Sequence, residues 1–345
     1  MTASQTIGIV PVDKHAAAAA RARQDQLVKP PGSLGRLEEL ACWLAGVTAN
    51  ERPVVRARVV VAAADHGVAA ERVSAYPPEV TAQMLATLVS GRGAVTVLAA
   101  QVGAEVRVLD AGVRDAPELP GVERLGLEPS RNLAREPALS AVDVDAALAA
   151  GRELAATAAR EKMTVLVGGE LGIANTTPAT ALACWLTGRA PESMAGPGTG
   201  LDAEGVQRKA EIIRRALELH GPAIDDPREA LRRLGGGEIA VLTGLALGAG
   251  EQGLGYVCDG VIATAAAAVA VAMAPELAPR LLAGHRSAEG AHTALLDHLE
   301  LDPVLDLGMR LGEGSGATAA LAVLKLAASV HNGMATFAEA GVTSG

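Results

Sequence analysis

Two glutamates stand in short stretches of small and polar residues where a carboxylate could do acid–base chemistry. Residues 166–180 read LVGGELGIANTTPAT, in which an apolar, strand-like run leads to Glu170 and then to a polar stretch and a proline. Residues 309–327, MRLGEGSGATAALAVLKLA, place Glu313 between two glycines just before a long Ala/Leu run. The glycines indicate that bulk is not tolerated near this carboxylate. An apolar pocket would raise the pKa of Glu313 toward that of a general base, whereas a helix N-terminus would lower it, so Glu313 is either a base or a capping acid.

Two glycine-containing turns precede predicted helices and could hold an anion. In the first, Thr177 is expected to cap a helix that begins at Pro178, and the free N–H groups there, with the glycines, would cradle a phosphate. The second is GPGTGLDAEGVQRK (196–209), from which Lys209 could reach an anion. Neither is a Walker A or GxGxxG motif. The alternatives are an ordinary capped strand–helix turn and a flexible connector.

The histidines do not form a recognisable metal motif. His285, His292 and His298 are seven and six residues apart, which is not the i, i+4 spacing of a helical metal pair, and no HExxH is present. No metal is therefore expected. Asp65 and His66 follow an apolar run, where they could touch a ligand or hold a loop, and the loop role is favoured. No GxSxG motif or Cys–His nucleophile is evident.

The composition excludes several classes of protein. The chain has 345 residues, a formal net charge of −9 and 1% aromatic residues, so it lacks both the basic surface and the stacking platforms of a nucleic-acid binder. Its three cysteines, Cys42, Cys184 and Cys258, are scattered and fit a reducing compartment. The N-terminal residues lack the order of a signal peptide, and the apolar stretch 261–274 is too short and Ala-rich to span a bilayer. A cytoplasmic location without membrane contact is expected.

Alternation of strands and helices predicts an α/β fold with a mostly parallel, Rossmann-like sheet flanked by helices. Apolar runs at 57–67, 104–113 and 162–170 predict buried strands, and 114–140 is expected to be irregular. Helices are predicted at 14–27, 35–47, 77–91, 93–104, 138–160, 177–188, 204–219, 291–299 and 315–330, with further apolar helix or strand–helix pieces at 239–253 and 260–274. The first and last helices are expected to form a small helical domain (1–50 and 320–345) beside a large α/β domain (51–319) that carries the active site.

Eight segments together resemble one family, the nicotinate-nucleotide–dimethylbenzimidazole phosphoribosyltransferases. They occur in order and cover nearly the whole chain: KPPGSLGRLEELA (29–41), AADHGV (63–68), SAYPPEVTAQML (74–85), GGELGIANTTPA (169–179), GPGTGLD (196–202), GGGEIA (235–240), AGHRSAEGAH (283–292) and LDLGMRLGEGSGA (305–317). The resemblance implies a homodimer without metal or cofactor. It also implies transfer of ribose 5-phosphate from nicotinate mononucleotide to 5,6-dimethylbenzimidazole, which gives α-ribazole 5′-phosphate and nicotinate in the assembly of the lower ligand of cobalamin.

The same resemblance implies roles for individual residues. Glu313 matches the proposed catalytic base, which takes the benzimidazole N–H proton while the other ring nitrogen attacks C1′ with inversion. Glu170 is the candidate for stabilising the oxocarbenium charge. The positions implied to lie along the nucleotide and its phosphate are Gly172, Asn175, Thr176, Gly198, Thr199, Gly200 and Lys209. The positions implied to line the acceptor-base pocket are Ser74, Tyr76, Gln83, Met84 and Leu311, of which the tyrosine could pack on a flat base.

Other functions stay open at this point. Arg92 stands where a second glycine of a pair is expected, so the acceptor could instead be a purine or a phenol. A non-catalytic nucleotide sensor is the alternative of another class, and the presence of both Glu170 and Glu313 argues against it. A pyrophosphate-dependent phosphoribosyltransferase is disfavoured, because the chain lacks the paired acids and Thr-rich phosphate loop of that class.

Overall fold

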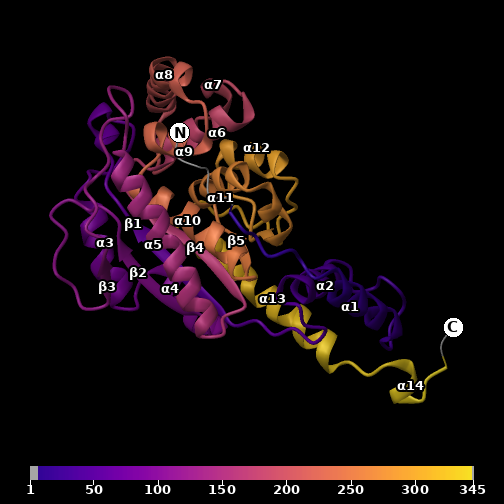
Figure 1. Cartoon of the computed structure of the whole chain (residues 1–345). Helices are drawn as coiled ribbons and strands as arrows, with labels where there is room; N and C mark the ends of the chain where they lie inside the picture. The colour runs from indigo at the N-terminus through magenta and orange to yellow at the C-terminus, as the bar shows by residue number, and fades with distance from the viewer. Residues whose placement is uncertain (1–6, 344–345) are drawn as a thin grey trace.

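The computed structural model describes residues 7–343 and places a six-stranded sheet at the centre of the fold (Figure 1). The strand order is β3-β2-β1-β4-β5-β6, and all neighbouring strands are parallel. The strands are β1 (Ala57–Ala63), β2 (Glu105–Asp110), β3 (Val122–Arg124), β4 (Val165–Leu171), β5 (Gly255–Cys258) and β6 (Leu281–Ala283). The predicted α/β class, a parallel sheet flanked by helices, is confirmed.

Helices cover both faces of this sheet. They are α1 (Lys14–Gln26), α2 (Arg36–Thr48), α3 (Val80–Val89), α4 (Ala94–Val102), α5 (Ala141–Arg160), α6 (Thr176–Thr187), α7 (Pro191–Met194), α8 (Ala203–His220), α9 (Pro227–Leu234), α10 (Gly237–Glu251), α11 (Val261–Met273), α12 (Gly290–His298), α13 (Ser315–Gly333) and α14 (Phe337–Ala340). Short 3₁₀ helices are η1 (Gly67–Glu71), η2 (Gly221–Ala223) and η3 (Pro275–Arg280).

The central strand β1 contributes apolar side chains to the hydrophobic cores on both faces of the sheet. All seven of its residues are buried. Val60 and Ala62 pack with α5, α6, α10 and α11, whereas Val59 and Val61 pack with α2, α3, α4 and α13. Because successive side chains of a strand point to opposite faces, a run that is apolar at every position marks a strand covered on both sides.

Most predicted elements are present, and the missed ones are short. The predicted strands correspond to β1, β2 and β4, and the predicted helices to α1–α6, α8 and α10–α13. The sequence did not predict β3, β5 and β6, because three or four residues are too few to show a period. β3 lies within 114–140, which was expected to be irregular. The helices α7, α9 and α14 were also missed.

Helices from both ends of the chain lie together at one side of the molecule (Figure 1). α1 and α2 pack on each other and on α13. Arg23 of α1 donates to the carbonyl oxygens of His331 (2.9 Å) and Met334 (3.0 Å), which tie the N-terminal helices to the end of α13. Residue 320, the predicted domain boundary, lies inside α13, so the two predicted domains share one continuous helix. The division into domains stays a prediction.

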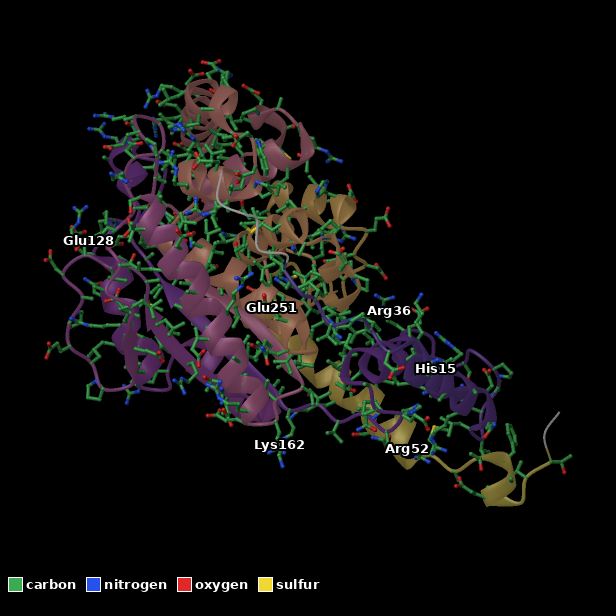
Figure 2. All side chains as sticks on the ribbon, in the orientation of Figure 1. His15, Arg36, Arg52, Glu128, Lys162 and Glu251 are labelled. Carbon is green, nitrogen blue, oxygen red and sulfur yellow. The ribbon has the colours of Figure 1, made fainter. Side chains whose placement is uncertain are left out.

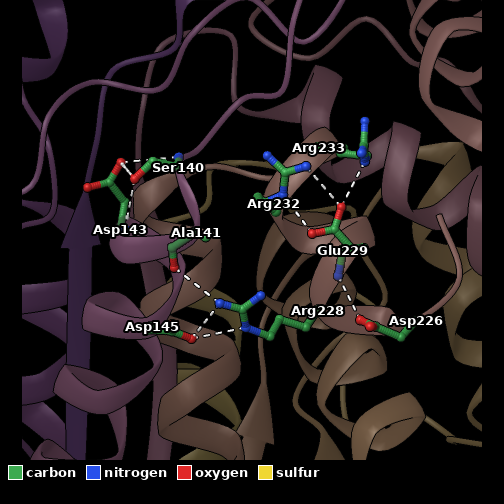
Figure 3. Close-up of polar contacts among 9 residues, drawn as sticks. All are labelled: Ser140, Ala141, Asp143, Asp145, Asp226, Arg228, Glu229, Arg232 and Arg233. Atoms are coloured by element: carbon green, nitrogen blue, oxygen red, sulfur yellow. Dashed lines mark hydrogen bonds and ion pairs between the residues drawn. The ribbon is translucent and has the colours of Figure 1, made fainter. Parts of the chain in front are cut away.

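Side-chain caps fix where α5 and α9 begin (Figure 3). Ser140 and Asp143 form a capping box at the start of α5, and the Asp226 side chain accepts a backbone N–H (2.8 Å) from the first turn of α9. Arg228 of α9 donates to Asp145 of α5 at 2.7 Å. These contacts hold the two helices in a common layer.

Glycines allow α5 and α10 to pack in backbone contact. A Cβ on Gly151 of α5 would lie 2.1 Å from the carbonyl oxygen of Val241, and a Cβ on Gly244 of α10 would lie 2.3 Å from that of Leu148. Real Cβ atoms do not approach a backbone oxygen so closely. The small-residue composition therefore sets the distance between these two helices.

We expect Gly151→Ala to lower the free energy of unfolding by about 1–3 kcal/mol, because the added methyl group must push two helix backbones apart. Urea unfolding would measure this. Gly333→Ala is the matched control, since nothing lies within 4 Å of a Cβ at that helical glycine. Equal unfolding midpoints for Gly151→Ala and the wild type would show that the helices are not held this closely.

Candidate active site

A cavity of about 480 Å³ opens at the carboxyl ends of the central strands. This is where ligands bind in open parallel sheets. Its walls come from the segments that follow β4, β5 and β6, from the start of α3, and from the turn before α13. The lining residues are Tyr76, Val80, Met84, Glu170, Leu171, Gly172, Ile173, Asn175, Thr176, Gly198, Thr199, Gly260, Val261, Ile262, His285, Ser287, Glu289, Arg310, Leu311, Gly312 and Glu313.

The structure brings most of the predicted site residues to this cavity. Those that line it are Glu170, Gly172, Asn175, Thr176, Gly198, Thr199, Tyr76, Met84, Leu311 and Glu313. Four others do not line it. The Ser74 hydroxyl lies 2.9 Å from that of Thr199 at the rim, Gln83 and Gly200 are exposed, and Lys209 is buried behind the cavity wall. Arg92 is exposed and also does not line the cavity.

Glu170 is a buried carboxyl at the end of β4. Charged side chains such as Arg36, Glu128 and Lys162 project from the surface of the molecule (Figure 2). The Glu170 side chain, in contrast, is buried. Burial raises the pKa of Glu170 to about 8, and the carboxylates of Asp259, Glu238 and Glu313 add to the rise. A hydrogen bond from the Asn175 side chain opposes it. The carboxyl group is therefore mostly protonated at neutral pH.

Glu313 lies beside Glu170 in a turn of left-handed backbone. Gly312, Glu313 and Gly314 have φ angles of 88°, 63° and 82°. The Glu313 backbone N–H donates to the carbonyl oxygen of Glu170 (3.1 Å), and its side-chain Oε2 accepts from the backbone N–H of Val95 (3.3 Å) at the start of α4.

Opposing effects act on the proton affinity of Glu313. Burial raises its pKa, the N–H groups of Val95 and Ala94 lower it, and the nearby carboxylate of Asp259 raises it. The net direction is upward, as a general base requires. The side chain is held by the N-terminus of α4 rather than by that of α13, the helix that follows it in sequence.

The glycine pair before Glu170 serves packing, and the prediction that these glycines form an anion cradle is wrong. Gly168 and Gly169 lie within β4. A Cβ on Gly169 would lie 2.3 Å from the carbonyl oxygen of Glu313, and one on Gly168 would lie 2.0 Å from the hydroxyl of Tyr256. Only glycine lets the turn that carries Glu313 approach the strand.

The predicted helix cap at Thr177 is also wrong. The helix α6 begins at Thr176, two residues before the predicted start, so Pro178 is its third residue, and the Thr177 side chain is buried. Asn175 is the N-cap residue, yet its side chain makes no cap hydrogen bond. That side chain donates instead to the carboxyl group of Glu170.

Side chains of both charges hold the second glycine loop, residues 196–202. The Glu289 carboxylate accepts from the backbone N–H of Gly198 at 2.9 Å, and Arg310 donates to the carbonyl oxygen of Gly198 at 3.2 Å. The Lys209 ammonium donates to the carbonyl of Gly196 (2.8 Å) and the hydroxyl of Thr176 (3.1 Å). Burial lowers the pKa of Lys209 to about 8, and Glu289 opposes this shift. Lys209 thus joins the two predicted phosphate segments.

Within residues 7–343, no group of three or more His, Cys, Asp or Glu side chains could hold a metal ion. His285 lines the cavity with Nε2 3.5 Å from Oδ1 of Asp259. The Nδ1 atom of His292 accepts from the backbone N–H of Ser287 (2.9 Å). Burial, together with the charge of His285, lowers the pKa of His292 to about 3, so it is neutral.

Asp65 and His66 hold loops and do not line the cavity, as the sequence favoured. Asp65 accepts from the backbone N–H of Arg114 at 2.9 Å. The two ring nitrogens of His66 lie 3.1 Å from the hydroxyl of Ser130 and 2.9 Å from the carboxylate of Glu238.

Sequence reasoning missed the part of the site that follows β5 and β6. The missed lining residues are Val80, Leu171, Ile173, Gly260, Val261, Ile262, His285, Ser287, Glu289, Arg310 and Gly312. Polar residues after an apolar run signal the end of a parallel strand. That signal was available at 255–260 and 281–289, but the strands themselves were too short to be predicted.

Comparisons with known proteins agree over almost the whole chain. A family model described as "Phosphoribosyltransferase" matches residues 9–342. The chain is 50% identical over 334 residues to a nicotinate-nucleotide–dimethylbenzimidazole phosphoribosyltransferase of Xanthomonas axonopodis pv. citri, with 96% of each chain covered. It is 50% identical over 335 residues to the protein of that name from Pseudomonas putida W619, covering 96% of this chain and 95% of the relative. The crystal structure of CobT from Thermus thermophilus superposes with a TM-score of 0.91 at 44% identity, covering 96% of this chain and all of that one.

We expect Glu170→Gln to stabilise the fold at alkaline pH. Because the pKa of Glu170 is raised from 4.5 to about 8 in the folded chain, the fold prefers the protonated form. The wild type therefore loses stability as pH rises from about 4.5 to 8, and the neutral variant does not. Urea unfolding should show the two to be similar at pH 4.5 and the variant more stable by roughly 1–4 kcal/mol at pH 8.5.

Glu128→Gln is the control for this comparison, because Glu128 is exposed. It should differ from the wild type by the same small amount at both pH values. A Glu170→Gln variant with no pH-dependent gain would show that Glu170 is already ionised in the folded protein.

Proposed function

Because the chain belongs to the nicotinate-nucleotide–dimethylbenzimidazole phosphoribosyltransferase family, we propose that it transfers ribose 5-phosphate from nicotinate mononucleotide to 5,6-dimethylbenzimidazole. The products are α-ribazole 5′-phosphate and nicotinate, and the nucleotide becomes the lower ligand of cobalamin. The observation that carries this proposal is the pair of buried carboxyl groups, Glu170 and Glu313, on one wall of a cavity at the strand ends.

Glu313 is the general base of the proposed reaction. The lone pair of one benzimidazole nitrogen attacks C1′ of the ribose as the bond from C1′ to the nicotinate nitrogen breaks. The other nitrogen then gives its proton to the Glu313 carboxylate. Attack from the face opposite nicotinate converts the β-nucleotide into an α-nucleotide. Burial keeps the pKa of Glu313 above its ordinary value, which favours acceptance of the proton.

Glu170 faces the positive charge of the donor. Nicotinate mononucleotide carries a cationic pyridinium ring, so the leaving group departs as a neutral ring without a general acid. Positive charge then develops on the ribose. A carboxyl group with a pKa of about 8 is ready to lose its proton when a cation arrives beside it, and its negative charge then stabilises the transition state.

Backbone segments bind the phosphate of the donor in this proposal. Asn175 and Thr176 stand at the start of α6 and line the cavity with Gly172, Gly198 and Thr199. Lys209 acts through the Gly196 carbonyl and the Thr176 hydroxyl, which hold its ammonium. The helix start orients N–H groups toward an anion.

Apolar side chains at the mouth of the cavity suit a flat acceptor base. Tyr76 and Leu311 are 56% and 61% exposed, and Met84 lies on the same wall. A planar base seated among them would cover this surface and stack on the tyrosine ring. Ser74 acts indirectly, because its hydroxyl holds Thr199. Gln83 is exposed on α3 and contributes no lining to the cavity in this structure.

We expect the purified protein to form an α-linked nucleotide from nicotinate mononucleotide and dimethylbenzimidazole, and Glu313→Gln to lower kcat by about 10²-fold or more. Chromatography and NMR of the anomeric linkage would measure the product. Glu128→Gln should keep the wild-type rate, because that side chain is exposed and outside the cavity.

The other outcomes separate the alternatives. An active wild type with an equally active Glu313→Gln variant would leave the reaction standing and remove Glu313 as the base. Product formed only with a purine or a phenol would change the acceptor. Nucleotide binding without turnover of any acceptor would make the protein a sensor.

We also propose that the protein is a homodimer that associates through α3 and α4. By length and composition alone, the stretch Val80–Val102 could cross a membrane, the one such stretch among the described residues, and it consists of these two helices. Only 28% of its most apolar window is buried. Val97 is 51% exposed on α4. A second copy of the chain would cover this apolar surface.

We expect Val97→Asp to convert the dimer into a monomer, because a carboxylate would be buried in an apolar interface. Sedimentation equilibrium would measure the mass. Val142→Asp is the matched control, since Val142 is 76% exposed at the start of α5 and should leave the dimer intact. A wild type that sediments as a monomer at micromolar concentration would contradict the dimer.

A further inference from the structure

Asp259 lies where two helices begin, next to the cavity but not in its lining. It follows β5 and directly precedes Gly260 at the start of α11. Its Oδ1 atom accepts from the backbone N–H of Ala317, in the first turn of α13, at 2.8 Å. The backbone N–H groups of Gly260 and Gly316 also act on this carboxyl group and lower its pKa. Its exposed fraction is 1%, so its hydrogen bonds and charge act in a dry environment.

His285 completes the arrangement from the next strand. Its Nε2 atom lies 3.5 Å from Oδ1 of Asp259. The imidazole ring occupies the space beside Gly316, where a Cβ would lie 2.1 Å from the His285 ring. On the other side, a Cβ on Gly284 would lie 2.5 Å from the Cα atom of Ala317. The first turn of α13 is thus enclosed by Asp259 and by the end of β6.

This turn sets the position of Glu313. Glu313 and its N-cap neighbour Gly314 directly precede α13, and both have left-handed backbone. A turn in this conformation keeps its geometry only where the surrounding structure holds it. Gly260, whose N–H acts on the same carboxyl group, also lines the cavity.

We propose that Asp259 is a positioning residue of the phosphoribosyl transfer. Its carboxylate holds the first turn of α13, and with it Glu313, against the cavity, and His285 is its partner. The proposal rests on the proposed function. It adds a residue that touches neither substrate.

The charge of Asp259 gives this role a measurable signature. The titratable groups that face it are His285, Glu170 and Glu313, together with Tyr256 and Cys258 on its own strand. Burial raises the pKa of Asp259, and His285 and the surrounding backbone N–H groups oppose this rise. In its ionised form the carboxylate raises the pKa of both glutamates. Removing that charge lowers both pKa values. The ionised forms then persist to lower pH, and the acid limb of the activity profile moves to lower pH.

The test is the kinetics of Asp259→Asn, which keeps the size of the side chain and removes its charge. We expect kcat to fall about 10- to 100-fold because the base is misplaced, while KM for each substrate changes less than about 3-fold. We also expect the acid limb of kcat against pH to move to lower pH. Asp110→Asn is the matched control. Asp110 is a buried acid that accepts backbone N–H groups from Gly112 and Val113 at the end of β2, outside the cavity.

His285→Gln supplies a second variant that leaves the hydrogen bonds of Asp259 to α13 in place. This variant should also lower kcat. The kcat of the double variant should be no lower than that of the less active single variant, because the two residues act as one unit. Thermal unfolding of each variant shows whether it is folded. If Asp259→Asn does not fold, His285→Gln decides, and a wild-type kcat in it overturns the proposal.

Further outcomes would overturn the positioning role. A kcat within 2-fold of the wild type in folded Asp259→Asn would do so. A fall in kcat with an unmoved acid limb would reduce Asp259 to a structural residue. If the wild type makes no α-linked nucleotide, the proposed function fails and this proposal fails with it. If the wild type makes the α-linked nucleotide and Asp259→Asn has the same kcat, only the positioning role is overturned.

Discussion

The site depends on the absence of side-chain volume between β4 and the turn that precedes α13. The carbonyl oxygen of Glu313 lies where a Cβ on Gly169 would have to be, and a Cβ on Gly312 would lie 2.3 Å from the Glu170 carboxyl. Glycine on both sides therefore brings two acidic side chains to one wall. Any larger residue would have to move the turn or the strand.

Bringing buried acids together has an electrostatic cost, and the structure offsets it differently at each carboxyl group. Glu238 faces the ring of His66, and Glu170 takes a hydrogen bond from Asn175 and keeps its proton near neutral pH. Asp259 and Glu313 instead accept N–H groups from helix starts. Different contacts thus act on each carboxyl group of the site, as suits a reaction with both a base and a cation stabiliser.

How much of this the sequence could show depends on the length of each element. The runs that became β1, β2 and β4 were long enough to be identified, so the site residues that follow β4 could be predicted. The residues after β5 and β6 could not be placed, because strands of three or four residues have no period. Asn175 shows a second limit. The helix cap was predicted at Thr177, whereas Asn175 is the N-cap residue of α6, and its side chain bonds to Glu170 instead of capping the helix. No local pattern carries the information on that tertiary contact.

The helices α4 and α13 explain why the base sits where it does. The start of α4 holds the Glu313 carboxylate through Val95, and the end of α4 accepts a hydrogen bond from Lys325 of α13 through the carbonyl of Val102. The two helices therefore run side by side with both N-termini at the cavity. Both helix ends present N–H groups there, one to Glu313 and the other to Asp259. The other end of α13 accepts a hydrogen bond from Arg23 of α1 through the carbonyl oxygen of His331. The position of the base is therefore linked to the packing of the N-terminal helices.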